Sequence, residues 1–196
     1  MADSSSLSSE QIRFGRTAIT VGVGDLVDQP VEAIVTAGNQ RAMFGAGAAG
    51  TLWTAAGEEV ERELRIQAPF DIGKAAATGS GRLQERGVRM ILHAIIAPGL
   101  GERPKQLAIP EALENAFDLA IAGKVRSIAI PLVGIGATAP PERRIERANQ
   151  IMETLVAVLR TRNHRIEHGI LVTRFEDDRA PLTALIARAR ERLWTS

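Results

Sequence analysis

The sequence contains no cysteine and only three histidines among its 196 residues. The absence of cysteine excludes disulfides, thiolate nucleophiles and cysteine-based metal centres. Three dispersed histidines offer too few ligands for a zinc cage of the usual kind. We therefore expect a protein without a metal site that requires no cofactor for folding or function.

Charge of one sign and long apolar runs are lacking as well. Lys and Arg number 24 against 23 Asp and Glu, so no overall field attracts nucleic acid or an anionic membrane. No apolar run is long enough to span a membrane, and the polar start MADSSSLSSEQI lacks the basic and apolar parts of a signal peptide. We expect a cytoplasmic, monomeric protein with a flexible tail over residues 1–12 and a single domain over residues 13–196.

Hydrophobic residues make up 45% of the chain, enough for the core of one domain. Strand-like and helix-like patterns alternate along it, which predicts a three-layer α/β/α sandwich. Gly57 divides the first helical stretch into two helices. The predicted strands cover residues 17–23, 32–38, 75–78, 88–96, 127–133 and 169–175, and the predicted helical stretches cover residues 48–64, 110–122, 142–160 and 180–193.

Residues 45–50 read GAGAAG, which matches the Gly-x-Gly-x-x-Gly pattern of dinucleotide-binding folds. In those folds the first glycine closes the first strand directly, and an acidic residue ends the second strand about 20 residues later. Here the segment NQRAMF, residues 39–44, separates the strand from the first glycine of the pattern, and the downstream segment EEVERELRIQ is an amphipathic helix. The spacing therefore argues against a dehydrogenase.

The glycine loop could still bind an anion without that fold. It opens a helix, whose unpaired N–H groups and positive dipole end favour an anion. A second glycine-rich loop, GIGATAPP at residues 134–141, follows the strand SIAIPLV, and its glycines let backbone amides converge on a phosphate. Two such loops after two central strands suit a diphosphate, although each could serve only as a tight connection.

Six motifs occur in an order that resembles the macrodomain family, the ADP-ribose-binding α/β module, over most of the chain. The resemblance implies a mixed, mostly parallel sheet of six or seven strands between helices, with ADP-ribose in a crevice at the strand ends. It implies no membrane contact. The motifs are GDL at 24–26, IVTAGN at 34–39, the glycine loop at 45–50, a Gly-x-Ala-like stretch at 73–83, LHA at 92–94 and PLVGIG at 131–136.

The resemblance also implies roles for individual residues. Asp25 would accept a hydrogen bond from the adenine amine while the Leu26 amide meets a ring nitrogen. Asn39 would bind the distal ribose, and Phe175, at the end of the last strand, would stack on adenine. The rest of the implied ligand-binding set is Ala37, then Gly45, Gly47, Ala48 and Ala49 from the first loop, and Val133, Gly134, Ile135, Gly136, Ala137 and Thr138 from the second.

Structural alternatives exist for most of these residues. Asp25 could cap a turn, Asn39 could shape the connection after its strand, and Phe175 could be a core residue. We interpret His93 as a structural, hydrogen-bonded side chain within an apolar strand. Trp53 and Trp194 are expected to pack against the domain, and the basic segments PERRIERANQ, residues 141–150, and RARERLW, residues 188–194, are expected to be solvated helix faces.

Family members that hydrolyse ADP-ribosyl esters resemble one another in an aspartate at the position of Ala49. A second hydrolase type uses a lysine and an aspartate at positions that correspond to Gly79 and Thr138, and the first asparagine of the family motif is Thr36 here. We therefore expect a binding module for free ADP-ribose or an ADP-ribosylated macromolecule, with nucleic acid a disfavoured partner. The alternative is a weak ADP-ribosyl ester hydrolase or O-acetyl-ADP-ribose deacetylase that acts through Asn39 and substrate-assisted attack of water.

Overall fold

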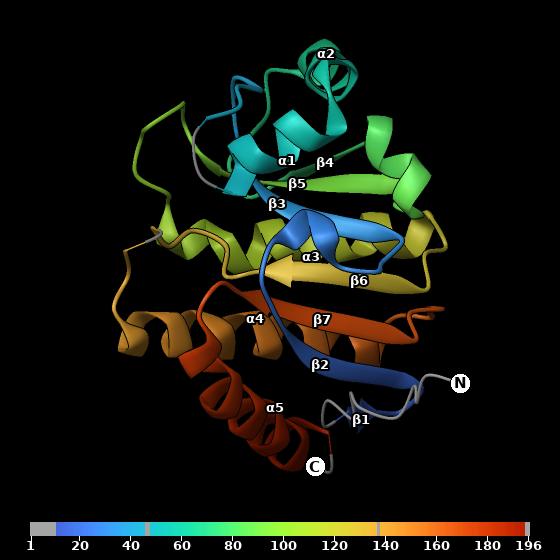
Figure 1. Ribbon diagram of the computed structural model, residues 1–196, viewed down its shortest axis with the longest axis vertical. Coiled ribbons are helices and arrows are strands. Elements are labelled where there is room, and N and C mark those ends of the chain that lie inside the picture. The colour runs from blue at the N-terminus through green and yellow to red at the C-terminus, as the bar shows by residue number, and fades with distance from the viewer. Residues whose placement is uncertain (1–10, 46–47, 137, 195–196) are drawn as a thin grey trace, which may run out of the picture.

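The computed structural model describes residues 11–45, 48–136 and 138–194. Its centre is one sheet with the strand order β1-β2-β7-β6-β3-β5-β4 (Figure 1). The five inner strands run parallel, and the edge strands β1 and β4 each pair antiparallel with a neighbour. The mixed, mostly parallel sheet is as predicted. Its strands are β1 (Ile12–Phe14), β2 (Thr17–Val23), β3 (Ala33–Asn39), β4 (Ala75–Thr78), β5 (Met90–Ala97), β6 (Ser127–Pro131) and β7 (His168–Thr173).

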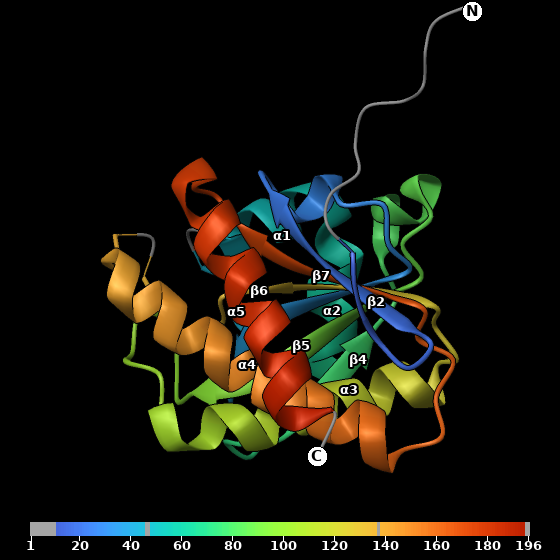
Figure 2. The ribbon, with the colours of Figure 1, turned by 90° about the horizontal axis from the view of Figure 1, so that it is seen from below.

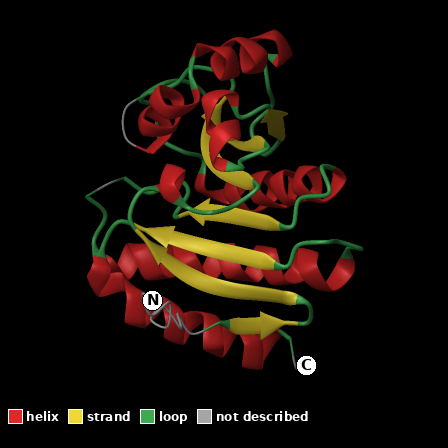
Figure 3. Ribbon diagram, turned by 45° about the vertical axis from the view of Figure 1, so that its right-hand side comes forward, coloured by secondary structure: helices red, strands yellow, loops and turns green. Residues whose placement is uncertain are grey.

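Helices cover both faces of the sheet, which confirms the three-layer arrangement. Helices α3, α4 and α5 lie together along one face (Figure 2), and α1 and α2 lie on the other, so that helices flank the strands in Figure 3. Gly57, with φ of 100°, separates α1 from α2 as the sequence predicts. The helices are α1 (Ala48–Ala56), α2 (Glu58–Gln67), α3 (Ile109–Ala122), α4 (Pro141–Thr161) and α5 (Arg179–Leu193).

Two apolar cores form because successive residues of a strand point to opposite faces of the sheet. On β3, Ala33 and Val35 pack in the larger core beneath α3, α4 and α5, whereas Ile34 between them packs with Leu52 of α1 in the second core. All three strand residues are fully buried. A strand buried on both faces reads as a continuous apolar run, which is the pattern that the sequence shows here.

Strand β1 was not predicted, because three residues are too few for a periodic pattern. It forms a short hairpin with β2, and its Phe14 packs edge-to-face against Trp194, with ring centroids 5.8 Å apart. Gly15 lies in the turn with φ of 58°, and a Cβ atom at this position would lie 2.8 Å from the Trp194 ring. Both the backbone conformation and the close contact favour glycine here. Trp194 therefore packs against the domain, as expected from the sequence.

Strands β6 and β7 each end two residues before the predicted end. Strand β6 ends at Pro131, because Pro131 accepts a hydrogen bond from the Val133 amide at 2.8 Å and the chain turns there. Strand β7 ends at Thr173, so Phe175 does not end the last strand as predicted. The Phe175 amide donates to the Thr173 hydroxyl oxygen at 3.3 Å instead of continuing the ladder.

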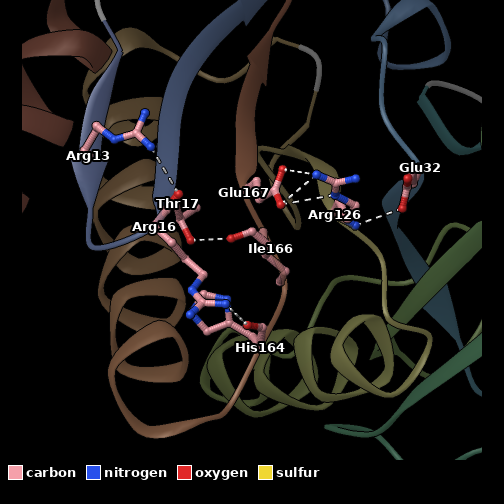
Figure 4. A network of polar contacts seen from close by, with 8 residues as sticks. All are labelled: Arg13, Arg16, Thr17, Glu32, Arg126, His164, Ile166 and Glu167. Atoms are coloured by element: carbon pink, nitrogen blue, oxygen red, sulfur yellow. Dashed lines mark hydrogen bonds and ion pairs between the residues drawn. The ribbon is translucent and has the colours of Figure 1, made fainter.

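The amino-terminal ends of the parallel strands carry a network of polar side chains (Figure 4). Arg126 donates to both carboxylate oxygens of Glu167 at 2.8 Å, and its own backbone amide donates to Glu32 at 2.8 Å. Thr17, which is fully buried, donates to the Ile166 carbonyl oxygen at 2.7 Å. The hydrogen bonds from Arg126 lower the pKa of Glu167 below its usual value. Polar groups at this end of the sheet thus satisfy one another.

Candidate functional site

A cavity of about 330 Å³ lies at the opposite end of the sheet, beyond the carboxyl ends of β2, β3, β6 and β7. Open parallel sheets bind their ligands at this end, where the connections that leave neighbouring strands diverge. The sequence-predicted site residues that line the cavity are Leu26, Ala37, Ala49, Val133, Gly134, Ile135, Gly136 and Phe175.

The second glycine loop supplies four consecutive lining residues, Val133 to Gly136. Gly134 has φ of 79°, and a Cβ atom at this position would lie 2.5 Å from Ile109 of α3, so both its backbone conformation and its packing require glycine. The Gly136 carbonyl accepts a hydrogen bond from the Ala139 amide at 3.0 Å, and the space beside its Cα is open. Exposed Thr138 does not line the cavity, and Ala137 lies outside the described residues.

The first glycine loop contributes through the start of α1. Ala49 and Thr51, in the first turn of that helix, line the cavity. Gly45 does not line the cavity. A Cβ atom at Gly45 would clash with the Leu100 side chain, and a Cβ atom at Gly50 would clash with the Gly45 carbonyl oxygen. Both glycines therefore have a packing role in seating the loop against the helix. Ala48 begins α1, and Gly47 lies outside the described residues.

The segment after β2 forms another wall. Gly24 and Leu26 line the cavity, but Asp25 between them does not. The Asp25 side chain is half-exposed and lies 3.3 Å from the Arg174 guanidinium, which does line the cavity. It makes no capping hydrogen bond with the short helical turn that follows it. The structure thus places Asp25 at the rim, in an ion pair.

The Asn39 side chain does not line the cavity. It is only 6% exposed, its Nδ2 donates to the Met43 carbonyl oxygen at 2.6 Å, and its Oδ1 accepts from the Arg41 and Met43 amides at 3.2 Å. This geometry matches the alternative role, an asparagine that shapes the connection after its strand. The implied contact with a distal ribose stays a prediction, and in this structure the loop backbone holds both ends of the side-chain amide.

Phe175 and Arg144 form one side of the cavity. Phe175 is 39% exposed, so it is not a core residue, and the Arg144 guanidinium lies 4.0 Å from the centre of its ring. Arg144 is paired with buried Asp178, and this hydrogen-bonded pair raises the pKa of the arginine. Burial raises the pKa of Asp178, but the hydrogen bonds from Arg144 and Thr173 together outweigh it, so the net pKa is lowered. Both groups of the pair are charged.

The lining has a clear electrostatic character. Its charged side chains are Arg144 and Arg174, and the described lining residues include no Asp, Glu or His. Each arginine is in an ion pair, Arg144 with buried Asp178 and Arg174 with half-exposed Asp25. The described lining residues include no side chain that could act as a general base. His93 lies outside the lining; complete burial lowers its pKa to about 3, and its Nε2 contacts the Thr78 hydroxyl at 3.0 Å, which agrees with a structural role.

The Macro domain family profile matches residues 35–151, more than half of the chain and most of the cavity lining. The chain belongs to the macrodomain family. A macro domain-containing protein of Caldanaerobacter subterraneus subsp. tengcongensis is 31% identical over 140 residues, which cover 68% of this chain and 76% of the relative. An O-acetyl-ADP-ribose deacetylase of Klebsiella pneumoniae is 29% identical over 171 residues, covering 84% of this chain and 94% of the relative.

The macrodomain fold is also found in solved structures. A mutant Oceanobacillus iheyensis macrodomain with ADPR superposes with a TM-score of 0.75 at 20% identity, over 93% of this chain and 98% of that one. Within the described part of this macrodomain, no helix has the length and apolarity needed to cross a membrane. The described residues also contain no group of three or more His, Asp and Glu side chains that could hold a metal ion.

Sequence reasoning missed the arginines of this macrodomain site. The segment 141–150 was expected to be a solvated helix face, yet Arg144 and Arg147 are 8% and 4% exposed. Both lie on the buried side of α4, because Arg144 stands four residues before Ala148 and Arg147 four before Ile151, and these two apolar residues are fully buried. The helical spacing was the available signal. Arg174 follows a strand end and had no comparable signal.

Proposed function

We propose that this macrodomain binds ADP-ribose, either free or attached to a macromolecule. The observation that carries the proposal is that the first turn of α1 and the second glycine loop line one cavity. Ala49 of the helix and Gly134 of the loop are 85 positions apart in the sequence (134 − 49), and only the fold brings them together. A ligand with two linked phosphates suits this arrangement.

The diphosphate would lie between these two segments. The positive dipole end at the start of α1 favours negative charge, and the amides of the second glycine loop would lie close to it. Arg174 lines the cavity in a half-exposed ion pair with Asp25, and its guanidinium could turn toward a phosphate. No lining carboxylate among the described residues opposes a phosphate there.

The base would lie between Leu26 and Phe175. Phe175 offers an exposed aromatic face for stacking, and Leu26 is a neighbouring apolar contact. Asp25 stands next to Leu26 and would accept a hydrogen bond from the adenine amine. Its ion pair with Arg174 is half-exposed, so the carboxylate can turn toward a base at small cost.

A second candidate function is weak deacetylation of O-acetyl-ADP-ribose, and the name and extent of the Klebsiella pneumoniae relative favour it. In the absence of a lining general base, water would be oriented by the phosphates of the substrate itself. Asn39 could take part only if its side chain left the loop backbone that now holds it. Binding without turnover is therefore the function that the geometry supports best.

Thermal shift and titration calorimetry with ADP-ribose, ADP, AMP and NAD test the proposal. ADP-ribose is expected to raise the melting temperature most, since a ligand that binds only the folded state stabilises it. No shift with any of the four compounds would contradict the proposal. Affinity that falls steeply with salt toward an oligonucleotide and ignores added ADP-ribose would indicate a nucleic-acid-binding protein instead.

Incubation with O-acetyl-ADP-ribose and with aspartyl- or glutamyl-ADP-ribosylated protein separates the two candidate functions. We expect no turnover above the rate without enzyme. Turnover that Asn39→Ala abolishes, with the fold retained, would establish the hydrolase instead of the simple binding module.

A further inference from the structure

Arg144 uses its whole guanidinium group. Nε and Nη2 donate to the two carboxylate oxygens of Asp178 at 2.7 and 2.8 Å, and Nη1 donates to the Ala139 carbonyl oxygen at 2.6 Å. The flat face of the group lies over the Phe175 ring. One side chain on α4 thus contacts two separate segments, the chain from Phe175 to Asp178 and the loop at Ala139, and it is almost fully buried.

One of these contacts leads to the second glycine loop. The Ala139 carbonyl oxygen accepts from Arg144, and the Ala139 amide donates to the Gly136 carbonyl oxygen at 3.0 Å. Gly136 lines the cavity. A shift of the guanidinium would therefore be transmitted through one residue, Ala139, to the loop that faces the proposed diphosphate.

The other contacts lead to Phe175. Its ring rests on the guanidinium, and its backbone amide donates to the Thr173 hydroxyl oxygen at 3.3 Å. The same Thr173 hydroxyl donates to Asp178 at 2.7 Å, and Asp178 is the partner of Arg144. The ring and the backbone of Phe175 are therefore both held by the Arg144–Asp178 pair.

We propose that Arg144 is a positioning residue that couples the aromatic platform at Phe175 to the second glycine loop, so that the two ends of the ligand bind cooperatively. This inference rests on the proposed function, because it takes ADP-ribose as the ligand that spans both ends. Lysine cannot replace the arginine in this role. It lacks the planar fork that pairs with both carboxylate oxygens while donating to a third acceptor and stacking on a ring.

The chain offers a matched control on the same helix. Arg143 precedes Arg144, but its side chain is 57% exposed and its ion pair is a surface contact with Glu146 at 3.6 Å. Arg144→Lys and Arg143→Lys make the same chemical change in the coupled and the uncoupled position. Arg144→Lys is expected to lower ADP-ribose affinity about tenfold, and Arg143→Lys less than about twofold.

A double-mutant cycle with Phe175→Leu tests the coupling itself. If Arg144 acts through Phe175, each single change costs about tenfold and the double variant about 20-fold, instead of the 100-fold expected for independent sites. Losses that multiply, or an Arg144→Lys variant with wild-type affinity, would overturn the inference. A wild-type protein that does not bind ADP-ribose would overturn the proposed function instead.

Amide NMR of the ligand-free protein gives a second readout that requires neither ADP-ribose nor a change at Arg144. Phe175→Leu is expected to shift the amide signals of Gly136 and Ala139 as well as those beside position 175. An Arg143→Lys variant is expected to leave the Gly136 signal in place. Unchanged Gly136 and Ala139 signals in Phe175→Leu would overturn the coupling, whatever the natural ligand is.

Discussion

The two ends of the sheet differ in whether their polar groups surround a cavity. At the amino-terminal end, Arg126, Glu167 and Glu32 satisfy one another, and Thr17 satisfies a backbone carbonyl. At the carboxyl-terminal end, a cavity lies between a helix start, a glycine loop and the Arg144–Phe175 wall, and the described lining has no acidic side chain. The difference teaches that the same parallel strands are joined by polar contacts at one end and leave room for the proposed binding site at the other.

The largest expected effect is on ligand affinity, from Gly136→Glu at the cavity end. The substituted Cβ atom meets nothing within 4 Å, so the fold should be retained, but the carboxylate would face the proposed diphosphate. We expect affinity for ADP-ribose to fall at least about 100-fold, or about 3 kcal/mol, because like charges oppose each other in the site. Titration calorimetry measures the loss.

Gly136→Gln is the matched control, since it adds similar bulk without charge. It is expected to lose clearly less affinity than Gly136→Glu. Equal affinity in Gly136→Glu and wild type would place the diphosphate elsewhere and remove the contrast between the two ends of the sheet.

Asp25→Ala should have the next largest effect. We expect ADP-ribose to bind about tenfold more weakly, or about 1.4 kcal/mol, because the adenine amine loses a charged acceptor. Arg174→Ala removes the ion-pair partner of Asp25 but leaves the carboxylate in place. If Arg174→Ala lowered the affinity for ADP-ribose and Asp25→Ala did not, the arginine and not Asp25 would be the ligand contact.

Thr17→Val tests the other end of the sheet. It is expected to lower the free energy of unfolding by about 1 kcal/mol, because the Ile166 carbonyl loses its hydroxyl donor in a buried position. Chemical denaturation measures the change, and Thr17→Ser, which keeps the hydroxyl, should recover part of it. ADP-ribose affinity should stay at the wild-type value; a parallel loss of affinity would show that the two ends are not independent.

The smallest effect is expected from Glu167→Gln. Arg126 lowers the pKa of Glu167, so the ion pair stabilises the folded state above the usual pKa of a glutamate, and this contribution is lost as the pH falls through the lowered folded-state pKa. The melting temperature of the variant should lie slightly below that of the wild type at pH 7. The difference should shrink below about pH 4 and in high salt. A difference that grew in acid would contradict this assignment.

The sequence was sufficient for most of the fold because the inner elements have long periodic patterns. Strands β2 and β4 have the predicted bounds, and Gly57 divides the helices α1 and α2 as expected. Strand β1 has only three residues, and its position depends on Phe14 meeting Trp194, a contact between distant segments that no local pattern encodes.

The candidate site was only partly predictable. Glycine patterns identified the second loop because backbone geometry there requires glycine, as Gly134 shows. Side-chain roles were harder to predict, because Asn39 and Asp25 each had a nearby partner that competes with a ligand. Arg144 was missed because its partners, Asp178 and Phe175, lie more than 30 residues away in the sequence.

The contact between Phe14 and Trp194 has a consequence for synthesis of the chain. Trp194 follows the last described helix, so the edge hairpin of β1 and β2 cannot gain this anchor until the whole domain has left the ribosome. Strand β7, which pairs with the inner side of β2, also emerges late. During translation the backbone groups of β2 that later pair with β7 therefore stay unpaired until β7 emerges. An unpaired strand edge of this kind is a target for chaperones and for aggregation.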